Sequence, residues 1–199
     1  RKVFSTINQF ASSDLSACYI DITKDRLYCD AADSESRKAS VWVMGEIFDS
    51  LVKLLAPVLA YTAEEAWEHA GGKGSIHEQS FPEVNPKFAG KEAIAKVDAL
   101  FAVKAVIQTA IEKKVQAKDF KKNNEASVLL TLPANHPVCS LLEDAAFAKE
   151  FFILSELNLG EGPEVSATVT PTGHPMCPRC RKYEPVVKDD LCQRCSDAV

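Results

Sequence analysis

The first part of the chain places apolar residues with the period of an α-helix. Apolar side chains recur at spacings of three and four between residues 4 and 28, and again between residues 41 and 55. These stripes predict two long helices, the second of which ends or kinks at Pro57, whose ring cannot continue helical hydrogen bonding. A shorter helix is expected next, started by a capping box in which Thr62 and Glu65 bond each other's backbone amides.

A turn and a linker separate this region from a third predicted helix. Residues 71–75 read Gly-Gly-Lys-Gly-Ser, an order that does not fit a phosphate-binding loop, so we interpret them as a turn. Residues 75–90 contain prolines and a glycine and indicate a linker. Residues 92–118 then carry an apolar stripe at helical spacing, which predicts a third long helix.

Beyond about residue 120 the pattern changes to short strands. Residues 127–132 and 151–154 are apolar runs, and residues 165–170 alternate between apolar and polar side chains, as in half-buried strands. Residues 137–150 have apolar side chains at helical spacing. The order strand, helix, strand, strand predicts a small mixed lobe.

These elements predict a mainly α-helical fold with three parts. They are a helical bundle at residues 1–90, a long helix with a small mixed α/β lobe at residues 91–170, and a C-terminal cysteine segment at residues 171–199. The 199 residues are 46% hydrophobic and 26% charged, which excludes disordered, collagen-like and coiled-coil proteins. Because the first residue is Arg1, we expect a piece of a longer protein.

The sequence shows no feature of a membrane protein or a targeting leader. Its most apolar region, residues 41–61, is interrupted by Glu46, Asp49 and Lys53, whose charges exclude a bilayer span. No charged and then apolar leader opens the chain. We therefore expect a cytoplasmic protein with no membrane partner.

Four of the seven cysteines have the spacing of metal ligands. Cys177 and Cys180 form one Cys-x2-Cys pair, Cys192 and Cys195 form a second, and eleven residues lie between the pairs. Two such pairs supply the four thiolates of a tetrahedral structural zinc site, which leaves no open position for catalysis. An odd cysteine number disfavours two disulfides, a redox motif needs one pair only, and iron–sulfur clusters usually have other spacings. We predict one structural zinc ion.

Four stretches, in their order along the chain, carry a resemblance to one enzyme family. Residues 15–28 contain Tyr-Ile-Asp-Ile-Thr-Lys-Asp-Arg-Leu-Tyr, residues 54–67 contain Leu-Leu-Ala-Pro and Tyr-Thr-Ala-Glu-Glu-Ala-Trp, and residues 75–82 contain Ser-Ile-His. The cysteine pairs stand in Cys-Pro-Arg-Cys and Leu-Cys-Gln-Arg-Cys. Together these motifs resemble the C-terminal region of isoleucyl-tRNA synthetases over essentially the whole chain. One departure is Arg181, where that family usually has tryptophan.

The resemblance implies an anticodon-binding region without catalytic residues. His-x-Gly-His and Lys-Met-Ser-Lys-Ser do not occur in the sequence, so isoleucine activation and ATP binding would belong to another part of the parent enzyme, which we expect to be monomeric. The synthetases for valine, leucine and methionine share the helical domain and are the alternative parents. The terminal cysteine motif distinguishes the isoleucine enzyme from the valine enzyme, which is expected to end in a helical arm.

The resemblance also implies that the partner is the anticodon stem-loop of tRNA(Ile). Splayed anticodon bases stack on aromatic or guanidinium planes, and RNA phosphates attract lysine and arginine. Although the net charge is −5, basic residues cluster near the cysteines and between residues 113 and 122. The candidate RNA contacts are Arg179, Arg181, Lys182, Tyr183, Arg194, Lys113, Lys114, Lys118, Lys121 and Lys122.

Three alternatives to these contacts stay open. The arginines near the cysteines could neutralise the thiolates, and the lysine run could be a solvated helix face. The zinc segment could be purely structural, with RNA bound by the helices alone. A zinc-knuckle module that binds another protein is the alternative function from a different class.

Overall fold

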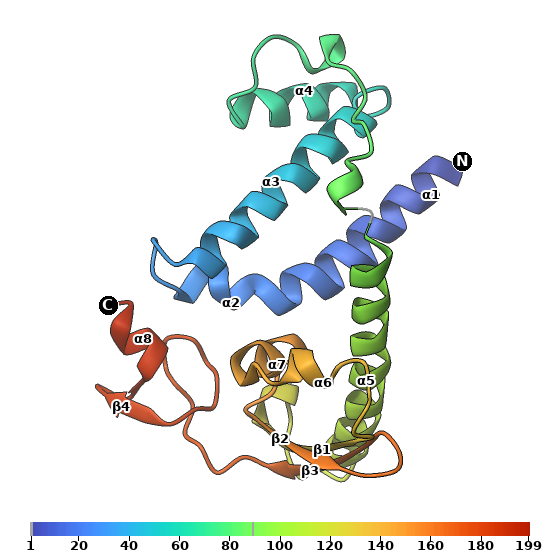
Figure 1. Cartoon of the computed structure of the whole chain (residues 1–199). Coiled ribbons are helices and arrows are strands. Elements are labelled where there is room, and N and C mark those ends of the chain that lie inside the picture. The colour runs from blue at the N-terminus through green and yellow to red at the C-terminus, as the bar shows by residue number, and fades with distance from the viewer. Residues whose placement is uncertain (1, 89) are drawn as a thin grey trace. The chain divides into compact units, whose positions relative to one another are not determined.

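The computed structural model describes residues 2–88 and 90–199 and divides into two compact units (Figure 1). One unit joins residues 1–31 with residues 91–199, and the other comprises residues 32–90. The predicted bundle over residues 1–90 therefore spans both units, and its first helix packs with the C-terminal part of the chain. Within the described residues, no helix is both long and apolar enough to cross a membrane.

A continuous helical rod opens the first unit. It consists of α1 (Lys2–Gln9), a π-helical segment (Phe10–Ile20) and α2 (Asp21–Cys29). The backbone remains in the right-handed helical region at both junctions, which confirms the helix predicted over residues 4–28. A π-helix winds wider than an α-helix, so this segment turns the side chains that follow it relative to an uninterrupted α-helix.

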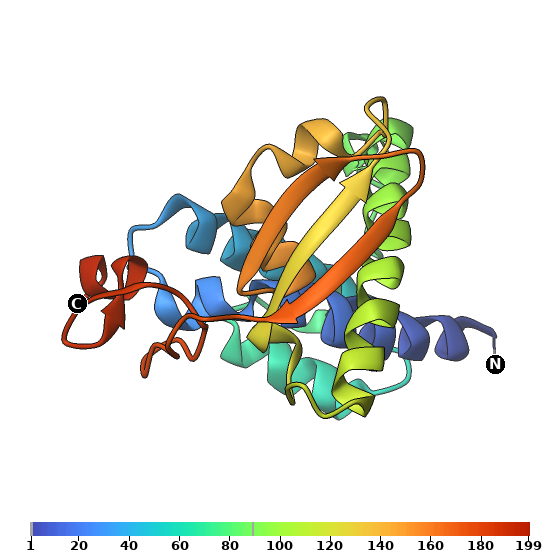
Figure 2. The ribbon, with the colours of Figure 1, turned by 90° about the horizontal axis from the view of Figure 1, so that it is seen from below.

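The main core lies between α5 (Lys91–Gln116) and a three-stranded sheet. The strands are β1 (Ala126–Leu132), β2 (Glu156–Glu161) and β3 (Ser166–Pro171). Figure 2 looks onto this sheet, in which the central β1 pairs in parallel with β2 and antiparallel with β3, while α5 runs beside β3. The predicted stripe of α5 is buried against this lobe and consists of Leu100, Val103, Ile107 and Ile111.

Two short helices, α6 (Cys139–Leu142) and α7 (Ala145–Phe152), connect β1 to β2. The chain has the order of strand, helix, strand and strand, but the predicted second strand at residues 151–154 is wrong, and its place is taken by β2, which was not predicted. Phe151 and Phe152 are the last residues of α7 and are buried, and the left-handed Ile153 (φ 58°) ends the helix. A short apolar run fits a buried helix end as well as a strand, so its pattern could not distinguish them.

The second unit contains α3 (Glu35–Leu55) and α4 (Ala60–His69), followed by single 3-10 turns at Ile76–Glu78 and Pro86–Phe88. Its core includes Val52, Ala56, Ala63 and Ile76.

The predicted capping box at Thr62 is wrong, because α4 begins earlier, at Ala60. The adjacent Glu64 instead accepts hydrogen bonds from the Ser75 hydroxyl and the Ile76 amide, both at 2.9 Å. These two hydrogen bonds hold the end of the predicted glycine turn against α4. Gly71 and Gly74 in this turn have positive φ angles.

Candidate metal centre and nucleic-acid interface

The C-terminal segment is a small cysteine knuckle that contains little regular structure. A hairpin of β4 (Val186–Lys188) and β5 (Leu191–Cys192) leads into the short helix α8 (Gln193–Asp197). The first cysteine pair lies in a loop that is closed by an antiparallel bridge between Met176 and Tyr183. The second pair lies at the junction of β5 and α8, so the hairpin turns the two pairs toward each other.

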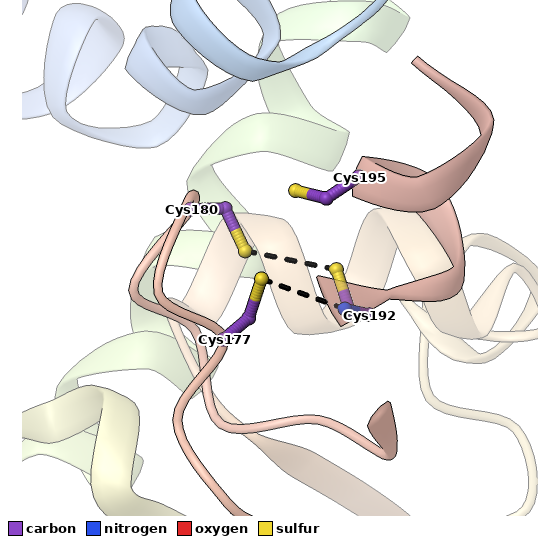
Figure 3. Close-up of side chains that lie close together, drawn as sticks. All are labelled: Cys177, Cys180, Cys192 and Cys195. Carbon is purple, nitrogen blue, oxygen red and sulfur yellow. Dashed lines mark hydrogen bonds between the residues drawn. The ribbon is translucent and has the colours of Figure 1, made fainter. Parts of the chain in front are cut away.

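The four thiols converge on one point, as Figure 3 shows. All four side chains are buried, and their Sγ atoms lie within 4.8 Å of one another. The Sγ atoms of Cys180 and Cys192 are 3.7 Å apart. Zn–S bonds of about 2.3 Å in a tetrahedron require sulfur atoms about 3.8 Å apart, whereas a disulfide requires about 2.05 Å. The cluster therefore has the size and donor set to hold one tetrahedrally coordinated metal ion.

Backbone amides around the first pair favour one thiolate. Burial opposes ionisation of Cys177, but the amide groups of Cys180, Cys192 and Arg179 together lower its pKa to about 6. The Cys192 amide donates to the Cys177 Sγ at 3.5 Å. Burial raises the pKa of the Cys180 and Cys192 thiols, which therefore keep their protons at neutral pH until a metal ion replaces them.

We expect metal affinity to rise with pH. Because the raised pKa values of Cys180 and Cys192 keep these thiols protonated, each must release a proton on binding, and acidification favours the metal-free form. Because two protons are released, the apparent affinity between pH 6 and pH 8 should rise by about a hundredfold per pH unit. Competition with a chromophoric chelator measures the apparent metal affinity at each pH, after correction for the protonation of the chelator itself. An affinity that is constant over this range would contradict thiol ligation.

Three of the predicted RNA contacts reach the C-terminal end of α2. Lys182 forms an ion pair with Asp25 at 2.9 Å. Arg179 donates to the backbone carbonyl of Cys29 at 2.5 Å, and Arg194 forms an ion pair with Asp30 at 3.2 Å. These partners on α2 lie 150 residues or more away in sequence, and sequence reasoning offered no signal that joined them to the knuckle.

Arg181 and Tyr183 have different surroundings from these cations. Arg181 is exposed and has a left-handed backbone (φ 60°), and its carbonyl accepts a hydrogen bond from the Asn124 side chain at 3.0 Å. Tyr183 is half-buried, and its carbonyl accepts a hydrogen bond from the Ser155 hydroxyl at 2.6 Å. Within residues 2–88 and 90–199, no ion pair holds the Arg181 guanidinium.

The predicted lysine run continues past the end of its helix. Lys113 and Lys114 lie in the last turn of α5, whereas Lys118 has a left-handed backbone (φ 64°) beyond the end of the helix at Gln116. Lys114 is half-buried and pairs with Asp119 at 2.9 Å. The exposed members of the run are Lys113, Lys118, Lys121 and Lys122.

One cavity brings the two basic zones together. It has a volume of about 460 Å³ and is lined by α2, by residues 122–124 and by the loop after the second knuckle cysteine. Lys122 comes from the lysine run, while Arg181 and Lys182 come from the knuckle. The sequence separated these zones by about 60 residues, so only the tertiary fold could place them on one surface.

Comparison with known proteins finds one matching family and several similar proteins. Residues 1–130 match the family described as the anticodon-binding domain of tRNA ligase. The chain is 32% identical to an isoleucine–tRNA ligase of Methylacidiphilum infernorum over 98% of its own length and 22% of that protein. It is 34% identical to that of Sulfurihydrogenibium sp. and 35% identical to that of Listeria monocytogenes, over 98% and 99% of this chain. The chain spans 23% of each of these two relatives.

Proposed function

Because the chain belongs to the anticodon-binding domain family of tRNA ligases, we propose that it is the tRNA-binding part of an isoleucine–tRNA ligase. The match to such ligases extends over the cysteine knuckle, beyond the residues matched by the anticodon-binding family. The observation that carries the proposal is the cavity between α2 and the knuckle, which Lys122 and Arg181 line from the two basic zones. The carboxylates that also line it are each paired with a cation: Asp21, Asp25 and Glu150.

We propose zinc as the ion held by Cys177, Cys180, Cys192 and Cys195. Four buried thiols are the donor set of structural zinc sites, and such an ion would cross-link the two cysteine pairs. Since four thiolates complete the tetrahedron, the site would supply folding energy and no catalysis.

The exposed basic residues are the proposed direct RNA contacts. The long side chains of the lysine run can reach phosphates, and the exposed Arg181 guanidinium can stack on an unpaired base at the mouth of the cavity. These contacts are Arg181, Lys113, Lys118, Lys121 and Lys122. The other candidates are half-buried, and we propose that they shape this surface: Arg179, Lys182, Tyr183, Arg194 and Lys114.

The chemistry of such a ligase would lie in the rest of the protein. ATP-dependent activation of isoleucine and its transfer to tRNA(Ile) would use a catalytic domain outside this chain, which by itself should be inactive. We place this ligase in the cytoplasm, as a monomer.

We expect the 199-residue chain to bind an anticodon stem-loop of tRNA(Ile) with an affinity that falls as salt rises. In single strands, log K falls by about 0.7 per log unit of salt for each phosphate contact. Replacing both Lys121 and Lys122 by alanine should therefore reduce this slope by about 1.4. Fluorescence anisotropy over a salt series measures the slope, and Lys96→Ala on α5, whose side chain pairs with Glu92, is the matched control.

Three further results test the candidate functions. Arg181→Ala should weaken stem-loop binding by about tenfold, as expected for the loss of one base-stacking contact. An affinity unchanged by substitution of the anticodon bases would contradict anticodon binding. Absence of salt-dependent RNA binding, together with a protein partner in pull-downs, would instead favour the protein-binding zinc module.

A further inference from the structure

The C-terminal end of α2 is the surface on which the cysteine knuckle docks. Three knuckle cations reach this one helix end: Lys182 reaches Asp25, Arg179 reaches the Cys29 carbonyl, and Arg194 reaches Asp30. The side chains in the two ion pairs are between 11% and 33% exposed, so water screens them less than it screens surface pairs. A cation at a helix C-terminus is also favoured by the helix dipole, which applies to Arg179.

A fifth cysteine closes the same contact. The Cys29 side chain is 7% exposed and belongs to the apolar cluster formed by the four knuckle cysteines and Leu191. Its thiol is not among the four that converge on the metal point. Cys29 is thus covered by the knuckle without being a ligand, which makes its accessibility a direct measure of docking.

The docked knuckle forms one wall of the cavity. Asp25 lines the cavity on α2, Arg181 lines it on the knuckle, and Lys122 lines it on the segment before β1. The Asn124 side chain holds the Arg181 carbonyl, so the backbone that carries this guanidinium is fixed from a second side. The Asn124 contact and the Lys182–Asp25 ion pair thus fix the Arg181 segment from two sides. Loss of the contacts with α2 would leave Asn124 as the remaining anchor, and Arg181 would be less fixed relative to Lys122.

We propose that Asp25 and Asp30 are positioning residues for RNA binding. They dock the cysteine knuckle on α2 and thereby hold Arg181 beside Lys122, without contacting RNA themselves. This inference rests on the proposed function, because it names how that RNA site is assembled. It follows that metal and RNA raise each other's affinity by the same factor, since each stabilises the docked knuckle.

The test uses the zinc-loaded 199-residue chain with the charges of Asp25 and Asp30 removed together, as Asp25→Asn with Asp30→Asn. We expect metal content to stay at one ion per chain, because all four thiols remain. Alkylation of Cys29 by iodoacetamide, followed by mass spectrometry, should become at least about tenfold faster, and stem-loop affinity should fall by about tenfold. Asp98→Asn, at an exposed position on α5, is the matched control and should change none of these quantities.

A charge exchange separates positioning from general destabilisation. Asp25→Lys and Lys182→Asp should each weaken stem-loop binding, whereas the double variant restores the ion pair and should recover most of the affinity and the protection of Cys29. Equal Cys29 protection and equal RNA affinity in wild type and the Asp25→Asn, Asp30→Asn variant would overturn the inference alone. If the wild-type chain does not bind the stem-loop, the proposed function fails, and the positioning role fails with it.

Discussion

Replacing Cys192 by serine should abolish metal binding and unfold the C-terminal knuckle, while the sheet and α5 remain folded. The only buried apolar cluster described for this segment consists of its four cysteines and Leu191, together with Cys29 of α2. Without a metal ion, four thiols cannot supply the free energy that orders so many residues. Structural zinc contributes about 10–16 kcal/mol in zinc-finger peptides, and we expect a loss of that order for folding of the knuckle.

Metal analysis and limited proteolysis measure this result. The variant should contain no stoichiometric zinc, and protease should cleave within residues 171–199 while leaving the preceding lobe intact. Cys139→Ser is the matched control, because this half-buried cysteine lies outside the cysteine cluster and its Sγ donates to the Pro133 carbonyl at 3.7 Å. A knuckle that resists protease after complete removal of metal by a chelator would contradict a structural metal site.

Arg26→Ala should destabilise the first unit by about 3 kcal/mol, within the range for breaking a buried ion pair. The Arg26 guanidinium donates to both carboxylate oxygens of Glu150 on α7, at 2.5–2.9 Å. The two side chains are 24% and 14% exposed. Removal of the guanidinium leaves a largely buried carboxylate without its cation, which costs more than the pair itself contributes.

Urea unfolding of the whole chain measures this change, and the same helix offers a control. Lys24 pairs with Asp21 at 2.6 Å, but these side chains are 47% and 43% exposed, so Lys24→Ala should cost at most about 1 kcal/mol. Replacing Arg26 by methionine and Glu150 by leucine together should recover most of the loss, because no unpaired charge is then buried. Equal effects of Arg26→Ala and Lys24→Ala would show that the pair with Glu150 behaves as a solvated one.

Local patterns in the sequence predicted most of the regular structure. The rod over residues 4–28, the stripe of α5 and the strands at β1 and β3 follow from periodicity, because burial of one face repeats every 3.6 or every two residues. The wrong predictions, the strand at residues 151–154 and the capping box at Thr62, both concern element ends. There a short motif fits more than one structure, and tertiary packing decides which one forms.

Sequence reasoning likewise predicted one part of the candidate site and missed another. Two Cys-x2-Cys pairs are local motifs, so the sequence by itself determined which four thiols converge. It also determined where basic residues concentrate, but not which of them stay exposed. Arg179, Lys182 and Arg194 look like Arg181 in the sequence, and only the contacts with α2 distinguish them.

Only the tertiary structure decided that the knuckle docks on α2. Docking depends on groups about 150 residues apart, and each contact forms only when the chain brings Asp25, Cys29 and Asp30 opposite three particular cations. A charge pair has no periodicity and no fixed spacing along the chain, unlike a helix stripe or a cysteine pair. The sequence therefore specified the four convergent thiols, whereas the packing of distant segments decided which cations face α2 and which face solvent.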